Sequence, residues 1–506
     1  MKYSQKLQIL VVISSFCNLF ACQAQDSKQT TNNTNNTIGT QTTATSVNTN
    51  VSTPISMATN MVTKTANFVQ DSTTISRIYD QILLRGNCYK DLEYLCLKIG
   101  GRFAASPQAE KAVKWSKSVM DSLGLDSVWL QPVQVPHWER GKAEKGQIVT
   151  TKGKINVPIC ALGGSIGTGR QGITAQVIEV LQLAELATLG EAAIKGKIVF
   201  YNRPLNPAIY DTFEAYGGAG DQRRNGASEA AKFGAIGVIV RSLASNLDDF
   251  PHTGSMIYQL NVNQIPAIAI STNGAELLSK TLKNEPKTQF YFETHCQKYE
   301  DKTSYNVIGE IRGTEKPNEI IVVGGHLDSW DLAQGAHDDG AGCMQSIEVA
   351  RTLKRLNIKP KRTIRVIMYM NEEFGNRGGI AYAQYAEEQQ SRLKHVAAIE
   401  SDRGGFAPRG FTVDASPEKI LLLQKYLPFM KNYGIDFVKK GAGGVDITPL
   451  KVVNTTLIGY VPDSQRYFDL HHSTQDTFDK VNKRELELGA AAMTSLAYLL
   501  AEYGVE

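Results

Sequence analysis

The chain has 506 residues, of which 42% are hydrophobic, and its 54 Lys and Arg against 50 Asp and Glu give a net charge of +4. This length exceeds what one small core accommodates, so we expect two or more folded units. The charge is nearly balanced and no long basic run occurs, which argues against a nucleic-acid-binding protein.

The first 22 residues have the layout of a secretory signal. Lys2 and Lys6 precede a mostly apolar stretch, residues 7–20, that is too short to anchor the chain across a bilayer. We therefore predict export to the periplasm or the extracellular space. The stretch ends in Leu-Phe-Ala-Cys, which resembles a bacterial lipoprotein processing site. Two outcomes stay open: a lipid on Cys22 that anchors the protein to a membrane, or simple secretion.

A polar spacer follows the signal. Of the 38 residues from 23 to 60, 26 are Thr, Asn, Ser or Gln. Such a segment buries too little apolar surface to offset its conformational entropy, so we predict a disordered spacer over residues 23–70. Five cysteines lie beyond the signal, none in a CxxC pattern, which argues against a thiolate metal site. Cys88 and Cys96 either form a disulfide or are core residues of one helix.

Residues 71–149 are predicted to form the N-terminal part of a larger domain. A helix is expected over residues 75–97, and a second begins at Ser106 and Pro107 and ends at Gly124. A strand over residues 128–135 should be closed by Pro136.

Residues 150–295 are predicted to be a separate, smaller α/β unit. Short apolar runs at residues 197–201, 236–240 and 265–271 indicate strands, and residues 228–233 an Ala-rich helix. This unit carries no residues at the spacing of metal ligands.

Residues 296–506 alternate between strand and helix patterns. The strands are expected at residues 306–311, 319–323, 363–370 and 396–399, and the helices at residues 342–356, 418–433 and 483–503. This alternation predicts an α/β fold with a mostly parallel central sheet flanked by helices. In such sheets ligands bind at the carboxyl ends of the strands.

Five polar clusters lie at or after these strand ends. They are His326-Leu-Asp328-Ser-Trp-Asp331, His337-Asp338-Asp339, Glu372-Glu373, Glu400-Ser-Asp402 and His471-His472-Ser. Carboxylates and imidazoles without thiolates suit zinc. Two metal ions about 3.5–4 Å apart need a bridging carboxylate and two further ligands each. The clusters supply these five ligands, with one Glu left for proton transfer.

With these clusters the chain resembles the co-catalytic two-zinc exopeptidases, and among them the carboxypeptidase Q group. The resemblance covers about residues 75–505. It implies the zinc exopeptidase fold, two Zn²⁺ per chain, a peptide substrate and a homodimer. It also implies that residues 150–295 are an inserted protease-associated domain.

The resemblance assigns a role to each cluster. Asp338 would bridge the two ions, His326 and Asp402 would complete one site, and Glu373 and His472 the other. The further roles it implies are Glu372 as general base, Asp328 as the hydrogen-bond partner that fixes the His326 tautomer, Asp339 as the residue that shapes a turn through a cis peptide, and Asp476 as support for His472.

Three neighbours fall outside this set of ligands. His337 has no counterpart among the family ligands and is expected at the surface or rim. Tyr467 and Asp446 are expected either to contact substrate or to have a structural role.

The same residues are compatible with three functions. The first is an exopeptidase, such as a carboxypeptidase Q-like dipeptidase, that cleaves dipeptides or short peptides. The second is an aminopeptidase with the same metals, since specificity lies in the pocket walls. The third is a binding protein without activity, which the intact ligand set disfavours.

Overall fold

The computed structural model describes residues 54–505, with side chains from residue 68 onward. The predicted export signal, Cys22 and residues 23–53 of the predicted spacer lie outside the described residues. Helix α1 (Pro54–Arg85) begins inside the remainder of that spacer. None of the described helices has both the length and the apolar character needed to cross a bilayer.

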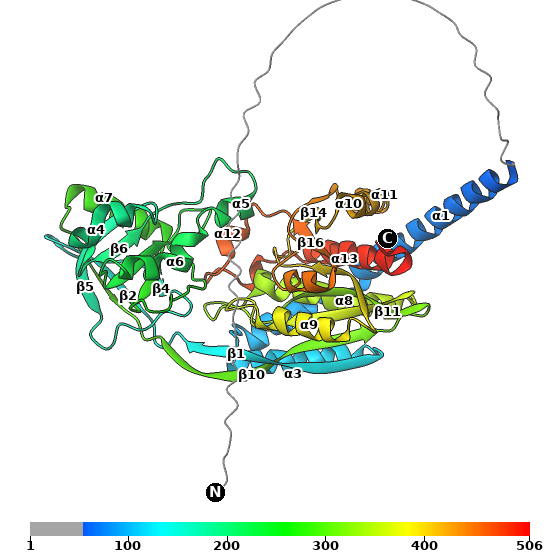
Figure 1. Ribbon diagram of the computed structural model, residues 1–506, viewed down its shortest axis with the longest axis horizontal. Helices are drawn as coiled ribbons and strands as arrows, with labels where there is room; N and C mark the ends of the chain where they lie inside the picture. Colours follow the sequence, from blue (N-terminus) through cyan, green and yellow to red (C-terminus); the bar gives the residue numbers. More distant parts are fainter. Residues whose placement is uncertain (1–53, 506) are drawn as a thin grey trace, which may run out of the picture. The chain divides into compact units, whose positions relative to one another are not determined.

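The first of two sheets has the strand order β1-β10-β12-β11-β13-β16-β14-β15. Its strands β1, β10, β11, β14 and β16 are labelled in Figure 1. Its central strands β12, β11, β13 and β16 are parallel to one another, and antiparallel pairs join β10 to β12 and β16 to β14. The predicted α/β class is thereby confirmed. The strands are β1 (Ser127–Glu139), β10 (Gln297–Ile311), β11 (Lys316–His326), β12 (Arg362–Tyr369), β13 (Lys394–Glu400), β14 (Pro408–Asp414), β15 (Phe437–Lys440) and β16 (Thr456–Pro462).

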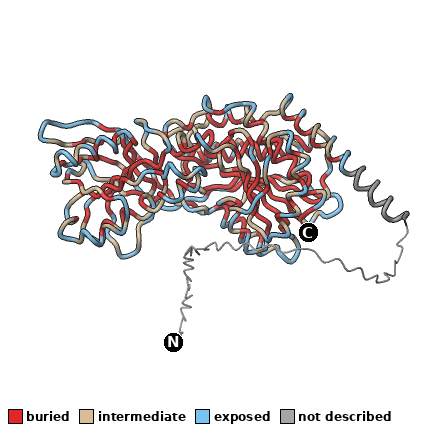
Figure 2. Tube along the Cα trace, turned by 90° about the horizontal axis from the view of Figure 1, so that it is seen from above, coloured by how far each residue is buried: buried red, intermediate tan, exposed pale blue. Residues whose placement is uncertain are grey.

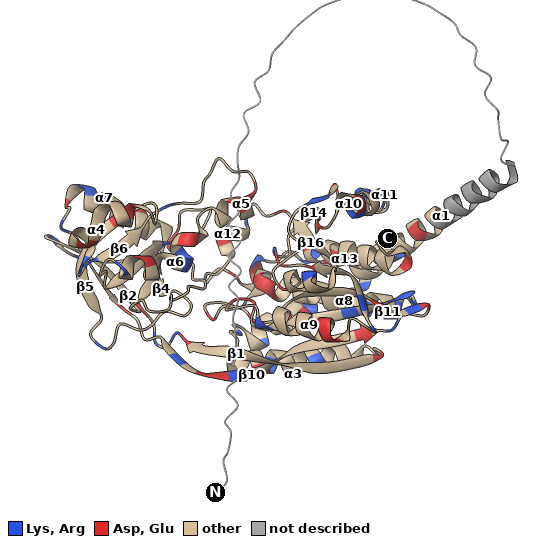
Figure 3. Cartoon of the chain, viewed as in Figure 1, with Lys and Arg blue, Asp and Glu red and all other residues tan. Residues whose placement is uncertain are grey.

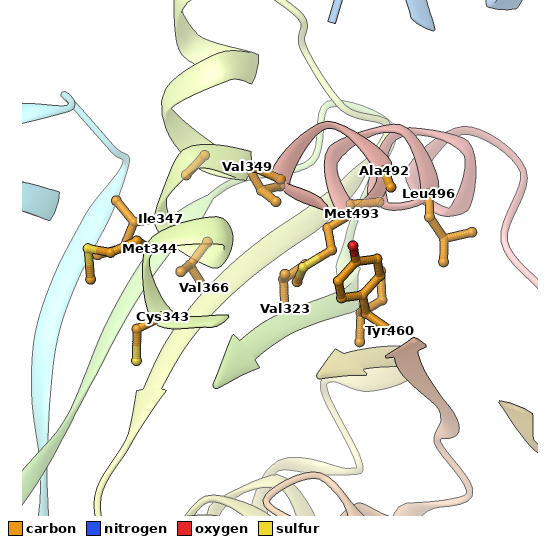
Figure 4. Close-up of a cluster of buried hydrophobic side chains, with 14 of the residues drawn as sticks. Val323, Cys343, Met344, Ile347, Val349, Val366, Tyr460, Ala492, Met493 and Leu496 are labelled. Carbon is orange, nitrogen blue, oxygen red and sulfur yellow. The ribbon is translucent and has the colours of Figure 1, made fainter. Parts of the chain in front are cut away.

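Helices cover both faces of this sheet because its central strands are apolar on both sides. Along β11, Ile321 and Val323 belong to one core, whereas Ile320 and Val322 belong to another. The larger core lies under α8 (Ala341–Arg355) and α13 (Lys483–Tyr503), which pack side by side (Figure 4). Helix α9 (Arg377–Gln389) packs its Tyr382 into the smaller core. A sheet buried on both faces presents its chemistry at the strand ends.

The remaining helices of this part are α2 (Cys88–Tyr94), α3 (Pro107–Ser122), α10 (Pro417–Gln424), α11 (Leu427–Met430) and α12 (Tyr467–Leu470). Ser106 caps α3 as expected, since its side chain accepts a hydrogen bond from Ala109 N. The helix predicted over residues 75–97 is instead broken at Gly86, where a Cβ would lie 2.4 Å from the Ile82 carbonyl oxygen. Strand β1 also continues past Pro136, where a bulge shifts its register to β10.

Residues 145–293, which we call the insert, form the second sheet, of order β3-β2-β9-β5-β6-β7-β8-β4. The insert leaves and rejoins the first sheet through the antiparallel pair β1 and β10. Its elements are β2 (Lys145–Thr150), β3 (Gly153–Asn156), β4 (Ile159–Ala161), β5 (Ile173–Val180), α4 (Glu185–Ile194), β6 (Ile198–Tyr201), α5 (Thr212–Gly217), α6 (Gly220–Ala231), β7 (Gly237–Arg241), β8 (Ala267–Ile270), α7 (Thr272–Asn284) and β9 (Gln289–Glu293). Its identity as a protease-associated domain stays a prediction.

Alternate residues of β6 divide the interior of the insert. Val199 and Tyr201 belong to one core, and Ile198 and Phe200 to the other. Buried segments accordingly run through both sheets (Figure 2). Acidic and basic residues are distributed over elements of both parts (Figure 3).

All five described cysteines are free and buried. The alternative of a disulfide between Cys88 and Cys96 is therefore wrong, and both are core residues. Both lie after the helix break, Cys88 in α2 and Cys96 in the π-helical turn Leu95–Ile99 that follows it.

Candidate metal centre

The polar clusters converge at the carboxyl ends of three parallel strands. His326 is the last residue of β11, Glu373 follows β12, and Asp402 follows β13. These strands are hydrogen-bonded neighbours, so their ends lie at one edge of the sheet. Asp338 comes from the loop that leads into α8, and His472 from the segment after α12.

Asp338 lies between two imidazoles. Its Oδ1 is 3.3 Å from His326 Nε2, and its Oδ2 is 3.2 Å from His472 Nε2. Asp402 Oδ1 lies 3.3 Å from His326 Nε2, and Glu373 Oε2 lies 3.0 Å from His472 Nε2. Each imidazole thus faces Asp338 and one further carboxylate, which is the arrangement that the resemblance implied.

In both His326 and His472 the second ring nitrogen, Nδ1, faces a backbone carbonyl oxygen. His326 Nδ1 lies 3.0 Å from Asp328 O, and His472 Nδ1 lies 3.2 Å from Thr253 O. Because a carbonyl only accepts, each Nδ1 carries the proton, which leaves Nε2 available as a metal ligand.

Thr253 belongs to the insert and holds His472 in a second way. Its backbone N–H donates to the His472 carbonyl oxygen at 2.9 Å. The two hydrogen bonds fix both the ring and the backbone of His472, whose φ of +61° lies in the left-handed region. A residue of the insert therefore sets the geometry of a residue of the metal centre.

The side chain of Asp328 has a different partner from the one predicted. Its carboxylate is 4.0 Å from the His326 ring, and the ring is instead oriented by the Asp328 backbone. Asp328 Oδ1 accepts hydrogen bonds from Asn371 N at 2.6 Å and Glu372 N at 3.1 Å. The carboxylate therefore holds the turn that carries Glu372 and Glu373.

Asp339 shapes the loop that carries Asp338, and the peptide between these two residues is cis. The Asp339 carboxylate accepts from His326 N at 3.1 Å and from Gly342 N at 3.0 Å. Glycines make room for it: a Cβ would lie 2.2 Å from Asp339 Oδ2 at Gly325, and 2.5 Å from Asp339 Oδ1 at Gly342.

Asp476 supports the same loop and not the His472 ring. Its carboxylate accepts from His337 N at 2.7 Å and from Asp338 N at 3.1 Å. The prediction that His337 lies at the surface is wrong: it is 1% exposed and stacks on Phe406 with ring centroids 4.3 Å apart. Phe406 comes from a distant part of the sequence, so no local pattern indicated this burial.

His471 lies close to the ligand that the spacing favours. Its ring stacks on that of His472 at 3.5 Å, and its Nε2 is 3.6 Å from Asp338 Oδ2. His472 Nε2 lies closer to Asp338 and also faces Glu373. The distances therefore favour His472 over His471 as the ligand.

The buried charges shift one another's pKa. Burial opposes the charged form of both His326 and His472. The pKa of His326 is nevertheless raised well above its usual value by Asp402 and Asp338. The pKa of His472 is raised in the same way by Glu373 and Asp338. Burial alone would raise the pKa of Asp338, yet hydrogen bonds to the two imidazoles hold it well below its ordinary range. Burial, aided by Asp338, raises the pKa of Glu373 to about 7.

The residues fit a cluster of divalent metal ions. Groups of three potential ligands, such as His326, Asp338 and Glu373, offer atoms that all lie within 4.8 Å of one another. Glu373 Oε1 and Asp402 Oδ1 are buried and accept no hydrogen bond within the described chain. Carboxylate oxygens are buried in this way when a cation can satisfy them, and this set of nitrogen and oxygen ligands suits zinc.

A cavity of about 530 Å³ opens onto these residues. Glu372, Tyr467 and His471 line it, together with Asp338, Glu373, Asp402 and His472. Asp446 is fully buried and does not line the cavity, although its neighbour Val445 does. A substrate contact stays a prediction for both Tyr467 and Asp446.

Part of the cavity wall comes from the insert, which carried no recognisable chemistry in the sequence. Its contributions are Phe213, Tyr216, Arg223, Arg224, Ser255, Met256 and Ile257. The adjacent pair Arg223-Arg224 was the only signal in the sequence, and nothing in that pattern indicated a cavity.

Two further arginines support the centre from outside the motifs. Arg102 is fully buried and donates to the carbonyl oxygens of Leu327, Gln334 and Gly335 at 2.5, 2.7 and 3.0 Å. Arg140 forms a two-pronged ion pair with Asp331, at 2.9 Å from Nε and 2.8 Å from Nη2. Both hold the loop between β11 and Asp338, and neither was found from the sequence.

Known proteins resemble this chain over most of its length. The family model described as Peptidase family M28 matches residues 306–497. Carboxypeptidase Q of Bos taurus is 34% identical over 414 residues, which cover 82% of this chain and 85% of that protein. Leucine aminopeptidase 2 of Arthroderma otae is 27% identical over 426 residues, or 77% of each chain.

Among solved structures, a peptidase M28 precursor from Shewanella amazonensis SB2B superposes with a TM-score of 0.82 at 32% identity, covering 86% of this chain and 98% of that chain. BSAP, a zinc aminopeptidase from Bacillus subtilis, has a TM-score of 0.60 at 20% identity, covering 82% of this chain and 94% of its own. The second likeness concerns the fold alone.

Proposed function

This chain belongs to peptidase family M28, and on that premise we propose that it is a zinc metallo-exopeptidase for dipeptides or short peptides, with two Zn²⁺ per chain. One observation carries the proposal: the two oxygens of Asp338 each face the Nε2 of a different imidazole, at 3.3 and 3.2 Å. A carboxylate placed in this way suits a bridge between two ions.

The proposed ligands divide into two sets around Asp338. His326 and Asp402 would hold one ion, and Glu373 and His472 the other. When bound, the zinc ions supply an acidified water and polarise the substrate carbonyl.

Glu372 is the proposed general base. It lines the cavity, and its backbone N–H is held by Asp328. Burial, together with the carboxylates of Asp402, Glu373 and Asp338, raises the pKa of Glu372 well above its usual value, which suits a group that accepts a proton near neutral pH. Glu372 would take the proton of the attacking water and deliver it to the leaving amine.

Glu372→Gln tests this role. We expect the variant to keep its zinc and to lose at least 10²-fold in kcat, since general-base catalysis contributes about 10²–10⁴-fold. Glu388→Gln, on the exposed part of α9, is the matched control and should retain full activity. Turnover by Glu372→Gln near that of the control would remove Glu372 from this role.

An aminopeptidase with the same metals is the second candidate, which the similarity to leucine aminopeptidase 2 favours. A dipeptide with a blocked amino terminus and an aminoacyl chromogenic amide separate the two activities. Cleavage of only the amide would establish an aminopeptidase. A metal-free protein after purification without chelator would favour a binding protein without activity.

Export directed by residues 1–22 and homodimer formation are also proposals, and they rest on the sequence alone. Partition of the full-length protein into detergent, lost in Cys22→Ser, would indicate a lipid anchor. Light scattering of the secreted form would measure the oligomeric state.

A further inference from the structure

We propose that Arg140 is a positioning residue for one of the two metal ions, the ion of Glu373 and His472, and not for the other. Through Arg140 the insert determines how tightly that ion is held. The inference rests on the proposed two-zinc function and gives the insert a part in it. It starts from the place of Arg140 at the junction between the two sheets.

Arg140 joins the first sheet to the insert with one buried guanidinium. It directly follows β1 and is 8% exposed. Toward the first sheet it forms the two-pronged ion pair with Asp331, on the loop that leads from β11 to Asp338. Toward the insert its Nη1 donates to the carbonyl oxygen of Ala161 at 2.6 Å. The N–H donors of a guanidinium lie in one fixed plane, so Arg140 sets the position of Ala161 relative to Asp331.

Ala161 is in turn joined to Thr253. The Thr253 hydroxyl donates to the same Ala161 oxygen at 2.8 Å. Two backbone hydrogen bonds made by Gly163, at 2.9 and 3.0 Å, join the segments that follow these two residues. Thr253 therefore keeps a fixed position relative to Ala161, and through it relative to Arg140.

The insert contacts His472 in two ways, and both depend on this junction. The Thr253 carbonyl oxygen lies 3.2 Å from Nδ1 of the His472 ring, so a displacement of Thr253 would turn the ring and move Nε2, the proposed ligand atom. The turn at Gly163 packs on the Trp330 ring, where a Cβ would come within 1.9 Å, and the Trp330 ring is 5.6 Å from that of His472. Loss of Arg140 would loosen both contacts.

The other set of proposed ligands lies on the first sheet alone. His326 Nδ1 faces the carbonyl oxygen of Asp328, two residues further along the same segment. Asp402 follows β13, a strand with a hydrogen-bonded partner on each side. Among the described residues, no hydrogen bond or ion pair joins His326 or Asp402 to the insert. The position of these two ligands therefore does not depend on Thr253.

Asp338, which the two ions share, is held without Arg140. Its backbone N–H donates to the Asp476 carboxylate at 3.1 Å. Arg102 holds the preceding residues of the same loop through two carbonyl oxygens, at 2.7 and 3.0 Å. A disturbance at Arg140 should therefore reach the ion bound by His472 and spare the other.

Competition for zinc with a chromogenic chelator tests the proposal on the zinc-loaded protein. In Arg140→Met we expect one ion to be held at least about tenfold more weakly and the other to change less than about threefold, since loss of a group that orients a metal ligand costs about 10–100-fold in affinity. Arg140→Lys, which keeps the charge but not the two-pronged fork, should give a smaller selective loss. Arg241→Met is the matched control, because Arg241 is a buried arginine of the insert whose partners, Asn202 and Glu276, do not line the cavity.

The His472→Ala background identifies the ion that is affected. There the remaining tightly bound ion is the one held by His326 and Asp402, and adding Arg140→Met should weaken it less than about threefold. Melting temperatures show whether each variant is folded, and Arg140→Lys decides the question if Arg140→Met is not.

Three results would overturn the positioning role and leave the two-zinc peptidase in place. They are an equal weakening of both ions, unchanged affinity for both ions, and a further loss of about tenfold or more in the His472→Ala background. Binding of fewer than two zinc ions by the wild type, or absence of Ala-Leu hydrolysis by the zinc-loaded wild type, overturns the proposed function and this role with it.

Discussion

Asp328→Ala is expected to damage the active site through the backbone that Asp328 holds. The side chain is fully buried, and its Oδ1 is the acceptor for the N–H groups of Asn371 and Glu372. Removing it leaves two buried donors unpaired, each at a cost of about 1–3 kcal/mol, so the free energy of unfolding should fall by about 2–6 kcal/mol. A shift of about 1 Å in Glu372 would lower kcat/KM by about 10²-fold.

Asp328→Asn separates this explanation from a role of the charge. An amide oxygen at the Oδ1 position still accepts both hydrogen bonds, and the His326 ring is oriented by a backbone carbonyl that the substitution does not touch. We therefore expect Asp328→Asn to lose less than about tenfold in kcat/KM, far less than the 10²-fold loss expected of the alanine variant. Dipeptide hydrolysis, zinc content and urea unfolding are the measurements, with exposed Asp301→Ala as control. If the asparagine variant were as impaired as the alanine variant, the carboxylate charge and not the turn would be the essential feature.

Three further predictions concern packing, pH and the chain ends. Gly342→Ala places a Cβ 1.9 Å from the Ser401 carbonyl oxygen and should lower the free energy of unfolding in urea by about 3 kcal/mol or more. The control Gly217→Ala adds a Cβ with nothing within 4 Å and should change that free energy little. Equal effects of the two substitutions would contradict the packing argument. Neighbouring carboxylates raise the pKa of the His326 and His472 imidazoles despite their burial, so a metal ion must displace their protons. The apparent affinity for the metal should therefore fall by up to about tenfold per proton for each pH unit from 8 to 6. An affinity that does not change with pH in chelator competition would refute this. Asp71→Ala removes the acceptor of two tyrosine hydroxyls of α13, at 2.8 and 2.6 Å, and should lower stability by about 2–4 kcal/mol without changing kcat/KM, which a parallel activity assay checks.

The parts of the fold that could be predicted from the sequence have a strong local signal. Helix α13 was expected over residues 483–503 and spans Lys483–Tyr503, because an apolar face at helical spacing continues throughout it. The strands that end near His326 and Asp402 were also expected, since their apolar runs are bounded by polar clusters. The helix expected over residues 75–97 is interrupted at Gly86, and an isolated glycine in a helical pattern does not by itself tell whether the helix ends there.

The site was predicted where its residues lie in motifs and missed where they come from distant segments. The residues expected as metal ligands are brought together, but Arg102, Arg140 and Arg223 reach the centre only through tertiary packing. The role of Asp328 was misassigned for the same reason: the sequence shows that it is two residues from His326, whereas its actual partners lie more than forty residues away. Spacing along the chain identifies reactive groups but not which backbone each of them supports.

The paired hydrogen bonds between Thr253 and His472 have a consequence for how the protein holds metal. A binding event that favours one orientation of His472 also favours the attached position of the Thr253 loop, and by thermodynamic linkage the reverse holds to the same extent. Any ligand that moves the insert would therefore change the retention of zinc, and zinc binding would in turn stiffen the insert. Replacing the insert by that of a relative would exchange the Thr253 contacts that hold His472, and would thereby alter the candidate metal centre as well as the cavity wall.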